Sequence, residues 1–124
     1  MSKLSRPDIG VSAEALDLLT FFECEPKPRD EADLSWEYNE WVYEFKSEGT
    51  SVSFAISPSY RDVKLVVKSK DAISYELNAK AVDDVKYHDD GGHELLEFVV
   101  HECHRVLLRL KPHVHLDHLV SRLL

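Results

Sequence analysis

Histidines near the C-terminal end are the residues whose type and spacing come closest to a metal site. They are His101, His104, His113, His115 and His118. Zinc sites use three or four ligands at about 2.0 to 2.3 Å, and two of these often come from one local segment. The pair His101 and His104, or the group from His113 to His118, could supply such ligands. A zinc-binding protein or a metal-dependent enzyme is therefore one hypothesis, and a solvated polar surface is the other.

The spacing of these histidines is not specific to any zinc-binding motif. The segment His101-Glu102-Cys103-His104 is one residue shorter than the zincin motif, in which two histidines lie four apart on a helix. If the segment around them is a strand, His113 and His115 share a face with Arg109 and Lys111. Such a cationic environment opposes metal binding, so we favour a solvated polar face.

Nucleophilic catalysis has little support in the sequence. Cys103 and His104 could pair as thiolate and base, but adjacent strand residues point to opposite faces of a sheet. We interpret Cys103 and Cys24 as structural residues. The carboxylate pairs Asp83-Asp84 and Asp89-Asp90 lie where turns are expected and lack the spacing of a calcium loop. We therefore assign no catalytic residue and expect a protein that is not an enzyme.

A second candidate site combines aromatic and acidic side chains. Five aromatic residues lie within ten positions: Trp36, Tyr38, Trp41, Tyr43 and Phe45. Core packing explains most of them, but Trp and Tyr also anchor interfaces when polar groups surround them. Acidic residues between them would select a basic partner. We therefore propose Glu37, Glu40, Trp41 and Glu44 as candidate partner-binding residues.

The net charge of −8 indicates which kind of partner to expect. It argues against binding to a nucleic-acid backbone and favours a basic partner protein. No apolar run reaches the roughly 18 to 20 residues that a membrane helix needs, and residues 1–7 lack the apolar block of a signal peptide. Two cysteines are few for a small secreted fold. We therefore expect a cytoplasmic protein with no membrane or nucleic-acid partner and no cofactor, apart from zinc under the metal hypothesis.

A length of 124 residues predicts one globular domain spanning residues 1–124. A chain of this size can bury a sufficient core without metal or disulfide bonds. Ser12 is expected to cap an N-terminal helix, which should end before Pro26. Apolar residues recur there at helical spacing, at Ala15, Leu18, Leu19 and Phe22.

Beyond Pro28 the pattern is that of strands. Residues 29–35 look like a loop, and from Trp36 to Phe45 side chains alternate with a period of two. The parity changes within that run, which a bulge or bend near Asn39 would explain. Further alternating strands are expected in four segments, at residues 51–57, 63–68, 73–77 and 82–88. Short turns between them predict an antiparallel meander.

Residues 95–118 fit two structures. Leu96, Val99, Cys103 and Leu107 would share one face of a helix, yet Val106 to Leu116 also alternate as in a strand and include Pro112. We favour a hairpin formed by 95–100 and 105–111, and the helix stays as the alternative. The expected fold is α+β, with an N-terminal helix packed on a mainly antiparallel sheet of about six or seven strands. An exposed sheet edge could also pair with a second copy to form a homo-oligomer.

The order of these segments resembles that of some small bacterial immunity proteins of polymorphic toxin systems. The resemblance rests on the N-terminal helix, on Trp41-Val42-Tyr43-Glu44-Phe45, and on the strands around Ser57-Pro58-Ser59. It continues through the segments at 82–87 and 108–114. It implies a cytosolic protein that neutralises a cognate toxin by tight binding. No diagnostic motif is shared, so no site residue is transferred from that family.

Overall fold

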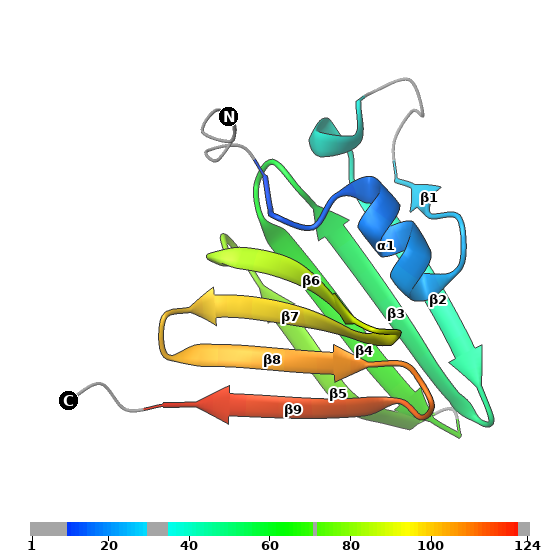
Figure 1. Ribbon diagram of the computed structural model, residues 1–124. Coiled ribbons are helices and arrows are strands. Elements are labelled where there is room, and N and C mark those ends of the chain that lie inside the picture. The colour runs from blue at the N-terminus through cyan, green and yellow to red at the C-terminus, as the bar shows by residue number, and fades with distance from the viewer. Residues whose placement is uncertain (1–9, 30–34, 71, 122–124) are drawn as a thin grey trace.

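The computed structural model describes residues 10–29, 35–70 and 72–121, which form one α-helix, one 3-10 turn and nine strands in two antiparallel sheets (Figure 1). The first sheet has the order β1-β2-β3-β4-β5 and the second has the order β6-β7-β8-β9. The bounds in the first part of the chain are α1 Ala15–Phe22, β1 Lys27–Pro28, η2 Trp36–Tyr38, β2 Trp41–Ser47, β3 Thr50–Ser57, β4 Asp62–Ser69 and β5 Ala72–Ala79. Those of the second sheet are β6 Asp84–Asp90, β7 His93–His101, β8 His104–Arg109 and β9 His115–Val120.

The N-terminal helix is confirmed, but its cap is not Ser12. Glu14 is the N-cap, and its backbone N–H donates to the Asp17 carboxylate at 2.9 Å while its own carboxylate accepts from the Asp17 N–H. This reciprocal pair is a capping box formed by two acids. Ser12 instead donates its backbone N–H to Asp84 at 2.6 Å, and its hydroxyl contacts the same carboxylate. Ser12 therefore ties the helix entry to β6 rather than starting the helix.

The first sheet follows the alternation that the sequence predicts. On the inner face, Val52, Phe54 and Ile56 of β3 are buried and lie beside the buried Leu65 of β4. The expected strand at 36–38 is wrong, because Trp36 to Tyr38 form the 3-10 turn η2 and β2 begins only at Trp41. The change of parity near Asn39 therefore marks the end of a turn and not a bulge in one strand.

The second sheet settles the ambiguity of residues 95–118 in favour of strands. β7 and β8 form the expected hairpin, in which Phe98 pairs with Val106 and Leu96 with Leu108. The sequence analysis missed β9, which pairs with β8 after the loop that contains Pro112. Gly91 and Gly92, both at positive φ, make the two-residue turn between β6 and β7. This turn needs that backbone conformation at both positions, which glycine adopts most easily.

The α+β class and the antiparallel pairing are confirmed, but nine strands in two sheets replace the expected single sheet of six or seven. The chain leaves the first sheet after β5. Val82 is buried in this connection, and its N–H donates to the carbonyl of Arg61 at 2.8 Å. The N–H of Asp83 then donates to the carbonyl of Val99 in the second sheet. A period-two pattern does not report which strands pair, so the division was not visible in the sequence.

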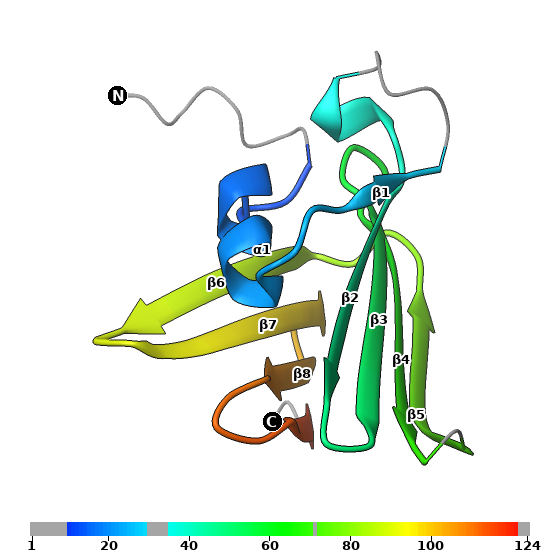
Figure 2. The ribbon, with the colours of Figure 1, turned by 90° about the vertical axis from the view of Figure 1, so that its right-hand side faces the viewer.

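Aromatic rings join the helix to both sheets. The ring of Phe22 stacks on Tyr43 and on Phe54, with centroids 5.3 and 5.6 Å apart. The ring centroid of Phe54 lies in turn 5.3 Å from that of Phe98 in β7. Figure 2 shows α1 in the corner where the two sheets diverge, next to β2, β6 and β7. The helix therefore closes one side of the core that the sheets share.

Two of the sequence-based expectations concern segments that the structure does not describe. The region expected to lack a signal peptide falls within residues 1–9, and most of the expected loop at 29–35 falls within 30–34. At its two ends, Arg29 pairs with Glu40 and Ser35 caps η2. In the described segments, no helix is long and apolar enough to cross a membrane.

We predict that Phe54→Ala lowers the free energy of unfolding by about 3 to 5 kcal/mol, because it removes a fully buried ring and leaves a cavity. Urea denaturation followed by circular dichroism measures this change. Ile73→Ala is the control, since its side chain is 57% exposed and its loss should change stability by less than about 0.5 kcal/mol. Equal losses in the two variants would show that Phe54 is not the centre of the core.

Candidate functional site

The structure does not gather the four predicted partner-binding residues on one surface. Trp41 packs against the core and donates its indole N–H to the carbonyl of Trp36 at 2.8 Å. Glu40 forms an ion pair with Arg29 at 3.0 Å. Glu44 is exposed on the opposite face of β2 from Trp41, and Glu37 lies in η2. These side chains thus have different surroundings, and Glu37 and Glu44 border two separate hollows of the surface.

Glu37 borders a small hollow of about 270 Å³ at one end of the molecule, which we call the η2 hollow. Three separate segments form it: the residues before α1, the turn η2, and the turn between β3 and β4. The lining residues are Gly10, Val11, Ala13, Glu14, Trp36, Glu37 and Pro58. Its wall is thus largely apolar, with two carboxylates.

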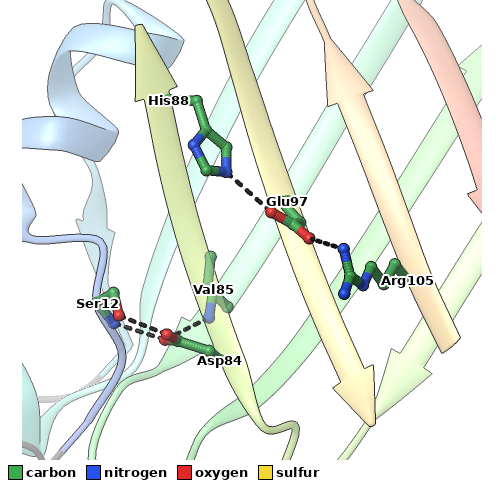
Figure 3. Close-up of polar contacts among 6 residues, drawn as sticks. All are labelled: Ser12, Asp84, Val85, His88, Glu97 and Arg105. Carbon is green, nitrogen blue, oxygen red and sulfur yellow. Dashed lines mark hydrogen bonds and ion pairs between the residues drawn. The ribbon is translucent and has the colours of Figure 1, made fainter. Parts of the chain in front are cut away.

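Backbone hydrogen bonds hold the walls of the η2 hollow. The N–H of Ser59 donates to the carbonyl of Glu37 at 2.9 Å, which joins the β3–β4 turn to η2. The N–H of Ala13 donates to the carbonyl of Val85 at 2.8 Å. Figure 3 shows the neighbouring contact, in which Ser12 binds the Asp84 carboxylate. These hydrogen bonds attach the segment before α1 to β6 and so hold it at the wall of the hollow.

Gly10 completes the wall at a position where other residues fit poorly. Its φ is +82°, and a Cβ added there would lie 3.5 Å from the carbonyl oxygen of Pro58. That distance is an ordinary contact, but L-residues rarely adopt this φ. The approach of the N-terminal segment to the β3–β4 turn therefore depends on glycine at this position.

Two exposed tyrosines flank the contact that joins η2 to the β3–β4 turn. Tyr38 follows Glu37 and is 59% exposed, and Tyr60 follows Ser59 and is 73% exposed. Tyrosine is enriched in the centres of protein interfaces because it combines a large apolar ring with a hydroxyl group. The sequence pattern predicts Tyr38 as one of several strand aromatics and gives no indication of a binding role for Tyr60. No pattern in the sequence links the two positions.

Glu44 borders a larger hollow of about 660 Å³ along the β2–β3 hairpin. Small side chains of β3, Ser51 and Ser53, form its floor, and Val66 and Lys68 of β4 lie at its side. Its charged lining residues are Glu44, Glu48, Lys46 and Lys68. The two signs are equal in number in this lining, whereas no lining residue of the η2 hollow is basic.

A charged cluster occupies the outer face of the second sheet (Figure 3). The Glu97 side chain is only 10% exposed and contacts His88 Nε2 at 2.8 Å and Arg105 at 3.2 Å. These three residues come from β6, β7 and β8, and their side chains meet diagonally across adjacent strands, since the register partners of Glu97 are Lys86 and Leu107. Because Arg105 compensates the charge of this carboxylate and His88 contacts its other oxygen, the cluster has an evident structural role in joining the strands.

The structure divides the five candidate metal ligands. His104 and His118 contact each other through their Nε2 atoms, with rings stacked at 4.5 Å, and His101 lies 5.4 Å from His104 between ring centroids. His113 is exposed in the β8–β9 loop, and the Nε2 atom of His115 lies 3.3 Å from Oδ1 of Asp117. Tyr75 of β5 reaches His118 Nδ1 at 3.3 Å, so the histidines lie at the seam between the two sheets.

The stacking of His104 and His118 is unfavourable for a shared metal ion. The lone pair of an imidazole nitrogen lies in the plane of its ring, and these planes are only 17° from parallel. Zinc in proteins requires three or four ligands, and this stacked pair supplies two at most. Across residues 10–29, 35–70 and 72–121, no three His, Cys, Asp or Glu side chains are grouped to hold a metal ion. Zinc binding remains a prediction of the sequence without support from this geometry.

The two cysteines, the buried Tyr43 and the partly buried Tyr87 have structural surroundings. The Cys24 thiol donates to the carbonyl of Glu44 at 3.1 Å, and Cys103 lies in the turn between β7 and β8. Burial raises the pKa of Tyr43 to about 12. Burial also raises the pKa of Tyr87, whose hydroxyl donates to Glu94 at 2.6 Å. Both hydroxyls therefore stay protonated at physiological pH.

We predict that His104→Asn weakens the dependence of stability on pH. Burial, and then His118 and His101, lower the pKa of His104 below its ordinary value of 6.5. Folding therefore favours the neutral ring, so its contribution to stability is complete above pH 6.5 and decreases as the pH falls below that value. Urea denaturation between pH 5 and 7.5 should show a shallower slope for the variant. His113→Asn, which changes an exposed ring, is the control. If the stability of His104→Asn depends on pH as steeply as that of the unmodified protein, the prediction is refuted.

Comparisons with known proteins agree with the fold described above. No protein-family model and no curated protein sequence matches this chain. Among solved structures, it is similar to a chain of a contact-dependent growth inhibition toxin–immunity protein complex from Klebsiella pneumoniae 342. The TM-score is 0.71 at 18% sequence identity, over 89% of this chain and 96% of that chain. At this identity the similarity shows a shared fold.

Proposed function

We propose that this protein is an immunity protein that neutralises a basic toxin by binding it, without catalysis, in the cytoplasm. The observation that carries the proposal is the similarity to a chain of a toxin–immunity complex, which extends over nearly the whole length of both chains. The resemblance noted in the sequence points to the same class. Partner recognition is a function that one small domain can perform with surface residues alone.

The charge of the chain supports the immunity role rather than the toxin role. A net charge of −8 on 124 residues produces a negative potential that accelerates association with a positively charged protein. Complementary charges also disfavour wrong partners, because like charges that meet across an interface cost several kcal/mol. An inhibitor that must capture a basic toxin quickly gains from both effects.

Affinity purification of the chain from its native host, followed by mass spectrometry of the intact complex, tests this proposal. The expected result is one basic protein at a ratio of one to one. Expression of that protein alone in a test bacterium should arrest growth, and co-expression of this chain should restore growth. A partner that does not impair growth, or an arrest that this chain does not relieve, would contradict the immunity function.

We predict that Glu44→Lys slows association with that partner by about three- to tenfold at low salt and has a smaller effect at high salt. Glu44 is exposed beside the larger hollow, so reversal of its charge changes the approach of a cationic surface. Surface plasmon resonance at two salt concentrations measures the rate. Glu102→Lys makes the same change of charge in an exposed turn of the second sheet and is the matched control. Equal slowing in both variants would mean that only net charge matters and that Glu44 has no special position.

A further inference from the structure

We propose that the η2 hollow is an arginine subsite that takes one arginine side chain of the basic partner. This inference rests on the proposed function, since it names the group through which the partner is recognised. It depends on the lining of the hollow, on the exposed tyrosines beside it, and on two carboxylates to which the described residues offer no cation.

The size of the hollow fits one side chain. Its volume is about 270 Å³, whereas sites for whole small molecules usually measure about 300 to 1,000 Å³. One long side chain inserted from a protein surface needs less room than a free ligand. The hollow therefore suits an anchoring residue of a partner better than a cofactor or metabolite.

The lining of the hollow suits both ends of an arginine side chain. Val11, Ala13 and Pro58 offer apolar surface to the three methylene groups. Trp36 offers an aromatic ring, on which a planar guanidinium group can stack. Glu14 and Glu37 are the two acidic residues that line the same hollow. The lining of the hollow therefore complements the methylene groups, the planar guanidinium group and the positive charge of an arginine side chain.

The two carboxylates are held in place but not neutralised. The carboxylate of Glu14 accepts the N–H of Asp17 in the capping box, which fixes its position and leaves other lone pairs available. The backbone carbonyl of Glu37 is tied to Ser59. The ion pairs formed among the described residues include neither acid, and no lining residue of the hollow is basic. Neither acid is therefore neutralised by an ion pair among the described residues.

The geometry favours arginine over lysine. A guanidinium group has five N–H donors in a fixed plane and can bridge two carboxylates, whereas an ammonium group is a compact and strongly hydrated charge. The ring of Trp36 adds to this preference, because stacking on an aromatic face requires a flat group. Tyr38 follows Glu37 in the sequence and Tyr60 lies two residues after Pro58, and both are exposed, so they are available to contact the partner around the inserted side chain.

Nuclear magnetic resonance of the full chain, labelled with nitrogen-15, tests the subsite with Nα-acetyl-arginine amide as the probe. We expect saturable shifts of the Trp36 indole N–H and of the Glu14 and Glu37 amides, with a millimolar dissociation constant. Nα-acetyl-norleucine amide has a similar apolar stem without the charge and should bind at least about tenfold more weakly. Shifts elsewhere only, or equal binding of the norleucine amide, would overturn the proposal.

The double variant Glu14→Gln with Glu37→Gln should raise the dissociation constant of the arginine amide by about tenfold or more. Glu48→Gln with Glu76→Gln makes the same change of net charge at exposed positions of the first sheet and is the matched control. Its dissociation constant should stay within about twofold of the value for the unmodified chain. An equal loss in both double variants would show a general effect of charge and no subsite.

The purified partner separates this inference from the proposed function. If the arginine subsite exists, the double variant of Glu14 and Glu37 should bind the partner at least about tenfold more weakly than the control double variant. Equal affinity of the two for the partner would overturn the subsite even if the chain still relieves growth arrest. Conversely, loss of affinity only in the double variant, with a partner that does not arrest growth, would support the subsite and refute the immunity function.

Discussion

The ring of Phe54 is the contact on which the rest of the fold depends. It lies on the inner face of β3 and meets Phe22 of the helix, Tyr43 of β2 and Phe98 of the second sheet. Two sheets that diverge leave a wedge between them, and an unfilled wedge of this kind would be a cavity in the core. Phe21 and Phe22 fill it from the end of a short helix, so eight helical residues complete a core otherwise made of strands.

The position of the helix also determines the position of the η2 hollow. Because Phe22 holds the end of α1 in the wedge, the residues before the helix must pass over the end of the first sheet. There the bonds of Ser12 to Asp84 and of Ala13 to Val85 fix them to β6. The hollow is the space left where this segment crosses η2 and the β3–β4 turn. A contact in the core and a feature of the surface are thus linked through one short segment.

Much of the fold could be predicted from periodicity alone, because burial on one face is what a period of two reports. Val52, Phe54 and Ile56 are buried as expected, and Pro112 correctly favoured strands over a helix near the C-terminus. The division into two sheets was not predictable in this way. The alternation of β6 is the same whether it pairs with β5 or turns away, and the departure depends on backbone bonds of Val82 and Asp83.

The candidate site was harder to predict than the fold for a related reason. The η2 hollow combines residues near positions 10–14, 36–37 and 58, and no local pattern connects these segments. Glu37 was identified through its acidic and aromatic neighbours, whereas Glu14 was hidden because it also serves as a helix cap. Tyr60 stands alone in a turn, where a single aromatic residue carries no periodic signal.

The way in which the η2 hollow is built affects which of its side chains can be substituted. Its walls are joined through backbone atoms, such as the Ser59 N–H and the Glu37 carbonyl, and these bonds do not depend on the side chains of either residue. Exposed side chains at the hollow can therefore change at little cost to the core. A core held by aromatic packing and a surface hollow joined in part by backbone bonds can then vary independently of each other.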